Sequence, residues 1–276
     1  QPAVQCRQLM QRLDAKACWL APDWPEAGAG DWPCPLLTLD PDQSLPAEPG
    51  EFWLSQQQLT NLILTSGSSG EPKAVAHRLA AHLASARGSA ETIPLQPGDG
   101  WLLSLPLFHV GGYAIPWRCF LAGACVVLPN PDCSLSEHLL GGAITHLSLV
   151  PTQLYRLLQS PNFRLEQTAV RHLLLGGAPI PASLVAACQA QGVTPQVSYG
   201  LSEMATQVCT RYADGHSASV GTPLPGRELK LVDGEICVRG TTLFAGYYRG
   251  GRWNPPWMPM GGFTPAIWDD LPPKVN

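Results

Sequence analysis

A loop of small and hydroxylated residues follows an apolar, strand-like run at residues 58–65. The nine residues from Thr65 to Lys73, TSGSSGEPK, include two glycines, four hydroxyl side chains and one lysine. Glycine lets the backbone turn its N–H groups around an anion, hydroxyls add donors, and lysine adds a positive charge. The lysine lacks the spacing and the following hydroxyl of a Walker A loop. The pattern predicts an anion-binding loop, although the composition alone is equally typical of a flexible Gly/Ser surface loop.

Composition and charge narrow the function classes. The chain has 276 residues, 45% of them hydrophobic, which is enough for one large domain or two small ones. With 17 basic and 21 acidic residues the net charge is −4, which argues against a nucleic-acid partner. The nine cysteines form no CxxC pair, so we expect reduced thiols in a cytoplasmic protein. The longest apolar stretch, residues 119–129, is too short to span a membrane. The oligomeric state stays open.

Short strand-like and helical segments alternate around the loop. The strand-like runs are 58–65, 101–106, 124–129, 145–151, 172–177 and 195–200, and the helical segments are 77–91, 151–160 and 182–192. This alternation predicts an α/β fold with layers around a largely parallel sheet. We expect a partial N-terminal region and linker over 1–57 and an α/β core over 58–216. Strands and turns over 217–252 predict a small β-rich subdomain.

Five segments, in order along the chain, resemble the signatures of the adenylate-forming enzymes, which include acyl-CoA synthetases, luciferases and adenylation domains. The loop from Thr65 to Lys73 resembles their phosphate-binding pattern T-S-G-S/T-T-G-x-P-K-G, with Ser69 for the common threonine and Ala74 for the last glycine. The other four are SLPLFHVGG (104–112), LLLGGAPIP (173–181), YGLSE (199–203) and GTPLPG (221–226). Five ordered matches are far more specific than any one of them. The resemblance implies the layered fold of the adenylate-forming large domain.

The resemblance also implies an ATP site. The phosphate loop would hold the β- and γ-phosphates, with Thr65, Ser66, Gly67, Ser68, Ser69, Gly70 and Lys73. The adenine would lie between Tyr199 on one face and the backbone of Gly176, Gly177 and Ala178 on the other, and Gly200 would also bind the nucleotide. Ser202, in place of the family's threonine, would bind the α-phosphate, and Glu203 would hold Mg²⁺, a cation that prefers oxygen ligands. Attack of a carboxylate on the α-phosphorus brings two anions together, so catalysis depends on positioning and charge neutralisation.

Further residues would contact the acid. His109 would orient or gate the substrate at the mouth of the acyl pocket, beside Gly111, Gly112 and Leu201. The catalytic set implied by the resemblance is Lys73, His109, Ser202 and Glu203. Arg118 is interpreted as a helix-face residue, with carboxylate binding as the alternative. The other six histidines are interpreted as structural.

The sequence around these motifs is similar to that of one family of adenylate-forming enzymes, the 2-succinylbenzoate–CoA ligases of menaquinone biosynthesis. The similarity is strong over residues 58–250, although Gly111 stands where that family usually has serine. It implies conversion of a small carboxylic acid, with ATP and CoA, to an acyl-adenylate and then a thioester. Two alternatives remain: an acyl-CoA synthetase or adenylation domain for another aryl or fatty acid, and a non-catalytic nucleotide-binding homologue.

The tail at residues 253–276 shows no period of a helix or strand and is rich in proline and tryptophan. Codons for residues 260–268 exist that read DGWFHTRDL in a neighbouring frame, which resembles the family's ribose-binding segment. We therefore interpret 253–276 as a frame-shifted, non-native tail and expect the chain to be incomplete for the full ligase reaction.

Overall fold

The computed structural model describes residues 3–19, 31–37, 53–65, 72–232, 234–249 and 252–254. Its central element is a six-stranded sheet in the order β10-β9-β8-β7-β5-β6. β9 and β10 pair antiparallel, and the remaining neighbours in this sheet pair in parallel. Its strands are β5 (Gly100–Leu102), β6 (Cys125–Val127), β7 (His146–Leu149), β8 (His172–Leu175), β9 (Gln196–Leu201) and β10 (Thr206–Tyr212). The predicted α/β fold with a largely parallel sheet is confirmed.

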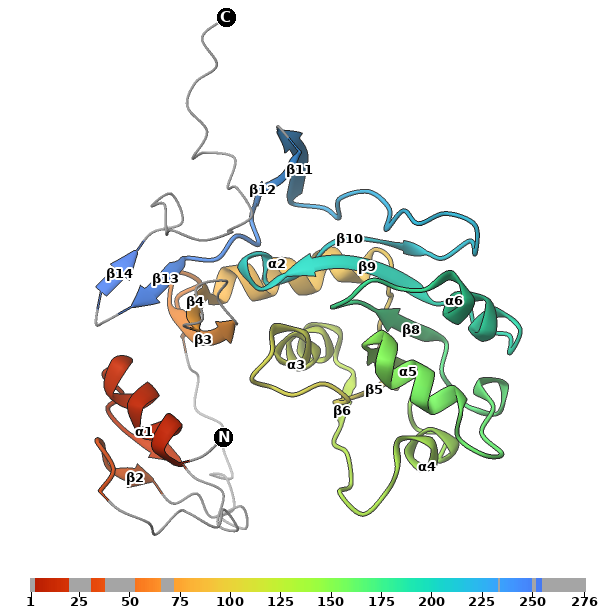
Figure 1. Ribbon diagram of the computed structural model, residues 1–276, viewed down its shortest axis with the longest axis horizontal. Helices are drawn as coiled ribbons and strands as arrows, with labels where there is room; N and C mark the ends of the chain where they lie inside the picture. The colour runs from red at the N-terminus through yellow and green to blue at the C-terminus, as the bar shows by residue number, and fades with distance from the viewer. Residues whose placement is uncertain are drawn as a thin grey trace, which may run out of the picture.

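Helices cover both faces of this sheet (Figure 1). They are α2 (Leu79–Ala90), α3 (Val110–Ala122), α4 (Leu135–Leu140), α5 (Pro151–Leu158) and α6 (Ala182–Gln189). Because side chains alternate along a strand, β8 sends Leu173 and Leu175 into one core and Leu174 into another. The first core also contains residues of α4, α5 and α6, and the second contains Ile115 and Cys119 of α3. The α/β layering therefore rests on two separate apolar cores.

A second sheet carries the predicted phosphate loop. Its order is β14-β13-β4-β3, with β3 (Leu59–Thr65), β4 (Lys73–Arg78), β13 (Gly246–Arg249) and β14 (Arg252–Asn254) paired antiparallel. The strands expected over 217–252 thus divide between two places. β11 (Arg227–Val232) and β12 (Glu235–Gly240) form a two-stranded sheet, whereas β13 joins β4. Trp253 and Asn254 continue β14, and the rest of the predicted non-native tail lies outside the described residues.

The N-terminal region contains α1 (Ala3–Arg12) and a parallel pair, β1 (Cys18–Trp19) and β2 (Leu36–Leu37). Arg12 Nη2 donates to the carbonyl of Pro72, which lies next to β4. Two 3₁₀ turns complete the described structure, η1 (Leu165–Gln167) and η2 (Ser202–Met204). No helix among the described residues has the length and apolar character that a bilayer crossing requires.

Buried histidines give a pH-dependent contribution to stability. Burial lowers the pKa of His77 to about 4, that of His172 to about 4, and that of His82 to about 3. For His82 and His172, a neighbouring histidine lowers the pKa further. These groups are neutral when folded and protonate more readily when unfolded, near pH 6.5. Their contribution is therefore fully present above pH 6.5 and is lost as the pH falls toward 4.

We predict that the free energy of unfolding falls between pH 7.5 and pH 5, with His77 alone accounting for on the order of 1–2 kcal/mol. Denaturant titrations at both pH values measure it. His172→Gln should reduce the difference, whereas His216→Gln, which removes an exposed histidine, serves as the control. Equal stability at the two pH values would contradict this electrostatic account.

Candidate active site

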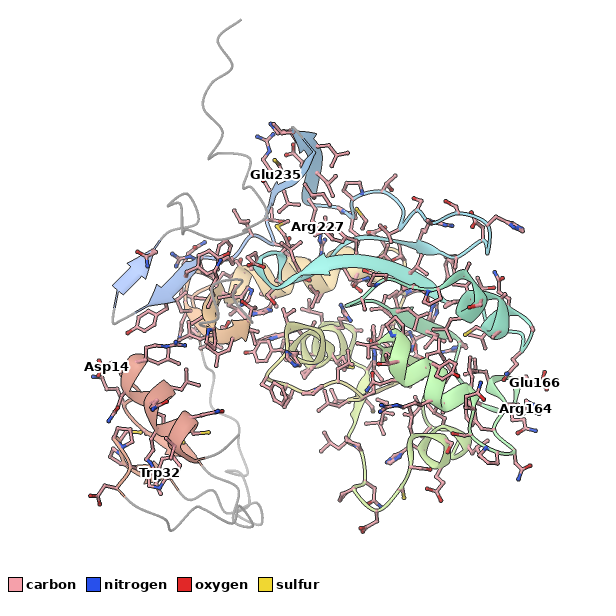
Figure 2. The ribbon with its side chains drawn as sticks, viewed as in Figure 1. Asp14, Trp32, Arg164, Glu166, Arg227 and Glu235 are labelled. Carbon is pink, nitrogen blue, oxygen red and sulfur yellow. The ribbon has the colours of Figure 1, made fainter. Side chains whose placement is uncertain are left out.

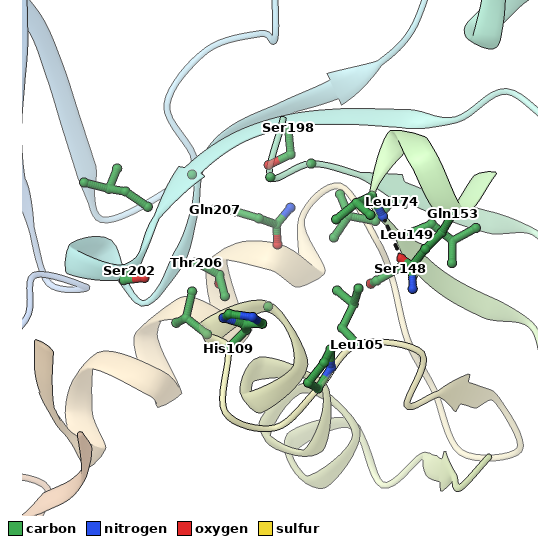
Figure 3. Close-up of a pocket in the computed structure, with 18 of the residues that line it drawn as sticks. Leu105, His109, Ser148, Leu149, Gln153, Leu174, Ser198, Ser202, Thr206 and Gln207 are labelled. Atoms are coloured by element: carbon green, nitrogen blue, oxygen red, sulfur yellow. Dashed lines mark hydrogen bonds between the residues drawn. The ribbon is translucent and has the colours of Figure 1, made fainter. Parts of the chain in front are cut away.

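A cavity of about 560 Å³ lies beside the carboxyl ends of β7, β8 and β9 (Figure 3). Carboxyl ends of parallel strands meet at one edge of a sheet, where α/β proteins bind ligands. The loop before α3 and the turn between β9 and β10 supply further walls. The structure brings seven of the predicted site residues together around this cavity: His109, Gly111, Gly176, Gly177, Gly200, Leu201 and Ser202.

A second cavity, of about 690 Å³, adjoins the first. Gly177, Ser198 and Gly200 line both, so the two spaces meet at the ends of β8 and β9. Ala178 and Tyr199, which the resemblance assigns to the adenine, line the second cavity alone. Gly176, which the resemblance also assigns to the adenine, lines the first cavity alone, so the residues predicted for the nucleotide extend over both spaces.

The third group of predicted residues surrounds Tyr247 of β13. The Tyr247 hydroxyl donates to Glu203 Oε1 at 2.9 Å, and Lys73 Nζ lies 5.5 Å from the centre of the Tyr247 ring. Lys73 begins β4 and pairs with Thr65, the last residue of β3. The loop that these two residues enclose, with Ser66, Gly67, Ser68, Ser69 and Gly70, lies outside the described residues. Lys73 and Glu203 therefore both lie against Tyr247, and Thr65 pairs with Lys73 across the β3–β4 ladder.

Two hydrogen-bond contacts to backbone carbonyls hold the segment of Ser202 and Glu203 in place. His77 Nε2 lies 2.6 Å from the carbonyl oxygen of Ser202, and the backbone N–H of Phe244 donates to the carbonyl of Glu203 at 2.7 Å. His77 is fully buried and stays neutral, because burial lowers its pKa to about 4. It can therefore donate one hydrogen bond to this carbonyl without burying a charge. This contact ties Ser202 to β4, the strand that follows the predicted phosphate loop.

Close packing explains two of the predicted glycines. A Cβ on Gly200 would clash with the carbonyl of Thr206, the first residue of β10. A Cβ on Gly112 would likewise clash with the carbonyls of Leu105 and Pro106, and Gly112 does not line either cavity. Gly112 therefore packs α3 against its own preceding loop, whereas the resemblance implied substrate contact.

Sequence reasoning missed several residues of the first cavity. Thr206 and Gln207 at the start of β10 line it, as do Ser148 and Gln153. In Figure 3, Thr206 and Gln207 descend from β10 toward the helix that follows His109. No local sequence pattern identifies these two side chains as cavity residues. Their direction depends on the positive φ angles of Ala205 and Thr206 and on the irregular pairing between Gln207 and Cys209. Arg118, for which carboxylate binding was the alternative interpretation, also lines this cavity, and it is the only charged residue in the apolar run from Val110 to Pro129.

Arg118 is a buried cation in the wall of the first cavity. It is 5% exposed, and its Nη2 donates to Gln207 Oε1 at 2.8 Å and to Thr206 Oγ1 at 3.4 Å. Its guanidinium carbon lies 4.9 Å from the centre of the Trp101 ring. Desolvation, and then repulsion by Arg227, lowers the pKa of Arg118 to about 10, so it stays protonated at neutral pH. Within the described residues no carboxylate forms an ion pair with Arg118, and its Nε has no hydrogen-bond partner.

The α/β fold and the two adjoining cavities agree with the fold that the resemblance implied, that of the adenylate-forming large domain. The sequence profile described as "AMP-binding enzyme" matches residues 8–248, and the chain belongs to this family. The 2-succinylbenzoate–CoA ligase of Salmonella typhimurium is 47% identical over 199 residues, which are 72% of this chain and 42% of that protein. The Escherichia coli enzyme of the same name is 47% identical over 195 residues, with 71% and 42% covered.

Solved structures agree with this assignment. Wild-type E. coli MenE with a bound phenylether-linked analogue of OSB-AMS superposes with a TM-score of 0.75 at 36% identity, covering 92% of this chain and 53% of that one. The O-succinylbenzoate coenzyme A synthetase (MenE) of Bacillus subtilis, in complex with ATP and magnesium ion, gives a TM-score of 0.65 at 30% identity, covering 75% and 46%. The chain thus spans about half the length of these proteins or less.

Gly200→Ala should lower the free energy of unfolding by about 2–3 kcal/mol, because its methyl group needs the space of the Thr206 carbonyl. Gly176→Ala is the matched control on the neighbouring strand end, where an added Cβ would meet only ordinary contacts with Ser198. Its effect should stay below about 1 kcal/mol. Urea denaturation measures both, and equal losses would show that the β9–β10 approach is not tight.

Proposed function

We propose that this chain binds and activates 2-succinylbenzoate with ATP, as part of an acid–CoA ligase of menaquinone biosynthesis. The relatives named above support the reaction class. The observation that carries the substrate class is the buried charge of Arg118 in the wall of an otherwise largely apolar cavity. 2-Succinylbenzoate has two carboxylates and one aromatic ring. One carboxylate is activated, and the other requires a cation inside the pocket.

The reaction proceeds in two displacements. A carboxylate oxygen attacks the α-phosphorus of ATP, the bond from that phosphorus to the bridging oxygen breaks, and pyrophosphate leaves. The CoA sulfur, after losing its proton, then attacks the acyl carbon and AMP leaves. The chain's part in the first step is to hold two anions in contact. Ser202 lines the first cavity, where we place the acid, and is the proposed hydrogen-bond donor to the α-phosphate.

Glu203 and Lys73 fit the charged end of ATP. Mg²⁺ binds through one or two carboxylates together with phosphate oxygens and water, so the single carboxylate of Glu203 is a sufficient protein ligand. Tyr247 donates to Oε1 of Glu203, and the carboxylate of Glu203 would hold the ion. When bound, Mg²⁺ draws charge from the phosphate oxygens. Lys73, at the end of the phosphate loop, adds a second positive charge nearby.

We also propose that the protein works in the cytoplasm. All nine cysteines lie within the described residues, and none of them is in a disulfide. Cysteines outside disulfides, several of them buried, are typical of a reducing compartment.

Arg118→Met should weaken binding of 2-succinylbenzoate by about 10- to 100-fold, since a charge-assisted hydrogen bond contributes about 1.5–3 kcal/mol. Calorimetric titration of the chain, with ATP and Mg²⁺ replaced by a non-hydrolysable analogue complex, measures the dissociation constant. Arg156→Met is the control, because Arg156 lies on the exposed side of α5. The unmodified chain should bind 2-succinylbenzoate at least tenfold more tightly than octanoate. Tighter binding of octanoate than of 2-succinylbenzoate would instead indicate that the cavity binds a fatty acid.

Tyr247→Phe should raise the Mg²⁺ concentration needed for half-maximal ATP binding by about 3- to 10-fold, because Glu203 loses the hydrogen bond that orients it. Binding of a fluorescent ATP analogue at increasing Mg²⁺ is the readout. Tyr248→Phe, on the adjacent position of β13, controls for loss of a hydroxyl. An unchanged Mg²⁺ requirement in Tyr247→Phe would remove Tyr247 from the proposed metal site.

A further inference from the structure

The turn between β9 and β10 has a strained backbone. Ala205 and Thr206 have φ angles of 48° and 109°, in the left-handed region that favours glycine. Thr206 is β-branched, which makes a positive φ more costly than for most residues. The pairing of β10 with β9 is also irregular between Gln207 and Cys209. Such strain persists only where the surroundings hold it in place.

Two buried side chains from outside the sheet hold this turn. Ser85 of α2 is 2% exposed, and its hydroxyl donates to the carbonyl of Ala205 at 2.6 Å and lies 3.0 Å from Thr206 Oγ1. Arg227, at the start of β11, is 5% exposed and donates from Nε to the carbonyl of Gln207 at 2.5 Å. Figure 2 shows Arg227 at the base of the β11–β12 hairpin, next to β9 and β10.

Ser85 and Arg227 also contact each other. Arg227 Nη2 lies 3.3 Å from both the carbonyl oxygen and the hydroxyl of Ser85, and Nη1 donates to the carbonyl of Pro225 at 2.9 Å. Gly88 makes room for this arginine, because a Cβ there would clash with the guanidinium. Glycine inside a helix costs about 1 kcal/mol relative to alanine. Arg227 of β11 thus contacts both α2 and β10, and the missing side chain of Gly88 provides the space for its guanidinium.

Gln207 connects the turn between β9 and β10 to the first cavity, because its side chain lines that cavity. Gln207 Nε2 donates to Thr210 Oγ1 at 2.7 Å, which leaves Oε1 to accept from Arg118 at 2.8 Å. Gln207 therefore bonds two buried guanidinium groups, Arg227 through its backbone carbonyl and Arg118 through its side chain. Because Gln207 is neutral, it orients Arg118 without cancelling its charge. The charge of Arg118 stays available to an anion in the cavity.

We propose that Ser85 and Arg227 are positioning residues that set the enzyme's preference for an acid with a second carboxylate, by fixing Gln207 and through it the guanidinium of Arg118. The proposal rests on the proposed function and extends it to residues outside the cavity. Neither Ser85 nor Arg227 lines the cavity, so their effect on the acid is transmitted through the turn. Loss of either contact should reduce selectivity between acids more than it reduces binding as a whole.

The test compares two acids on each protein variant. 2-Succinylbenzoate is the dicarboxylate, and 4-oxo-4-phenylbutanoate is the same molecule without the ring carboxylate. Calorimetry gives the ratio of their dissociation constants. Ser85→Ala should reduce the dicarboxylate preference about fivefold, the effect of about one hydrogen bond. Arg227→Lys, which keeps the charge but loses the fork of donors, should reduce it about tenfold or more.

Ser89→Ala is the matched control. Ser89 lies one turn further along α2, is 1% exposed, and its hydroxyl has no hydrogen-bond partner within the described structure. It should leave the ratio within about twofold of the unmodified chain. A purely structural role for Ser85 and Arg227 would weaken both acids equally and leave the ratio unchanged, which would overturn the proposal. An unmodified chain without any dicarboxylate preference would overturn the proposed function as well.

Discussion

The site depends on one buried positive charge that no carboxylate among the described residues neutralises. Arg118 lies on a helix with apolar neighbours and is held by two neutral oxygen acceptors, a glutamine amide and a threonine hydroxyl. A buried ion without a counter-ion raises the free energy of the folded state. Binding of an anion in the cavity is therefore expected to stabilise the folded chain. The fold supplies this arrangement from three elements, since α3 carries the arginine, β10 carries its acceptors, and β5 places Trp101 against it. The two apolar cores keep these elements in place.

The remainder of the site follows from where the two cavities meet. An acid and a nucleotide can react only if the carboxylate approaches the α-phosphorus, so their binding spaces must share a wall. Gly177, Ser198 and Gly200 form that wall at the ends of β8 and β9. Position 200 requires glycine because β10 lies too close for a Cβ there. At the same place Thr206 and Gln207 contact Arg118. In the proposed function, the connection between β9 and β10 therefore serves both the acid and the nucleotide.

Much of the fold could be predicted from the sequence, because short apolar runs alternate with amphipathic segments. The motif residues from His109 to Ser202 were also predictable as a group, and the structure gathers most of them around one cavity. Gln207, Ser85 and Arg227 could not be predicted. Ser85 contacts Ala205 and Arg227, which are 120 and 142 positions away, and Gln207 contacts Arg118, which is 89 positions away. These contacts also depend on a strained turn that no local sequence pattern reveals. Gly112 shows the opposite case, a motif residue whose role in the structure is packing.

The most direct measurement of the central claim is a crystal structure of the chain with 2-succinylbenzoate bound. The account predicts that one carboxylate lies within hydrogen-bonding distance of the Arg118 guanidinium, while the other lies near Ser202, toward the wall shared with the second cavity. Gln207 should keep its contact with Arg118 in that complex. A ligand that binds in the cavity with both carboxylates turned away from Arg118 would contradict the account.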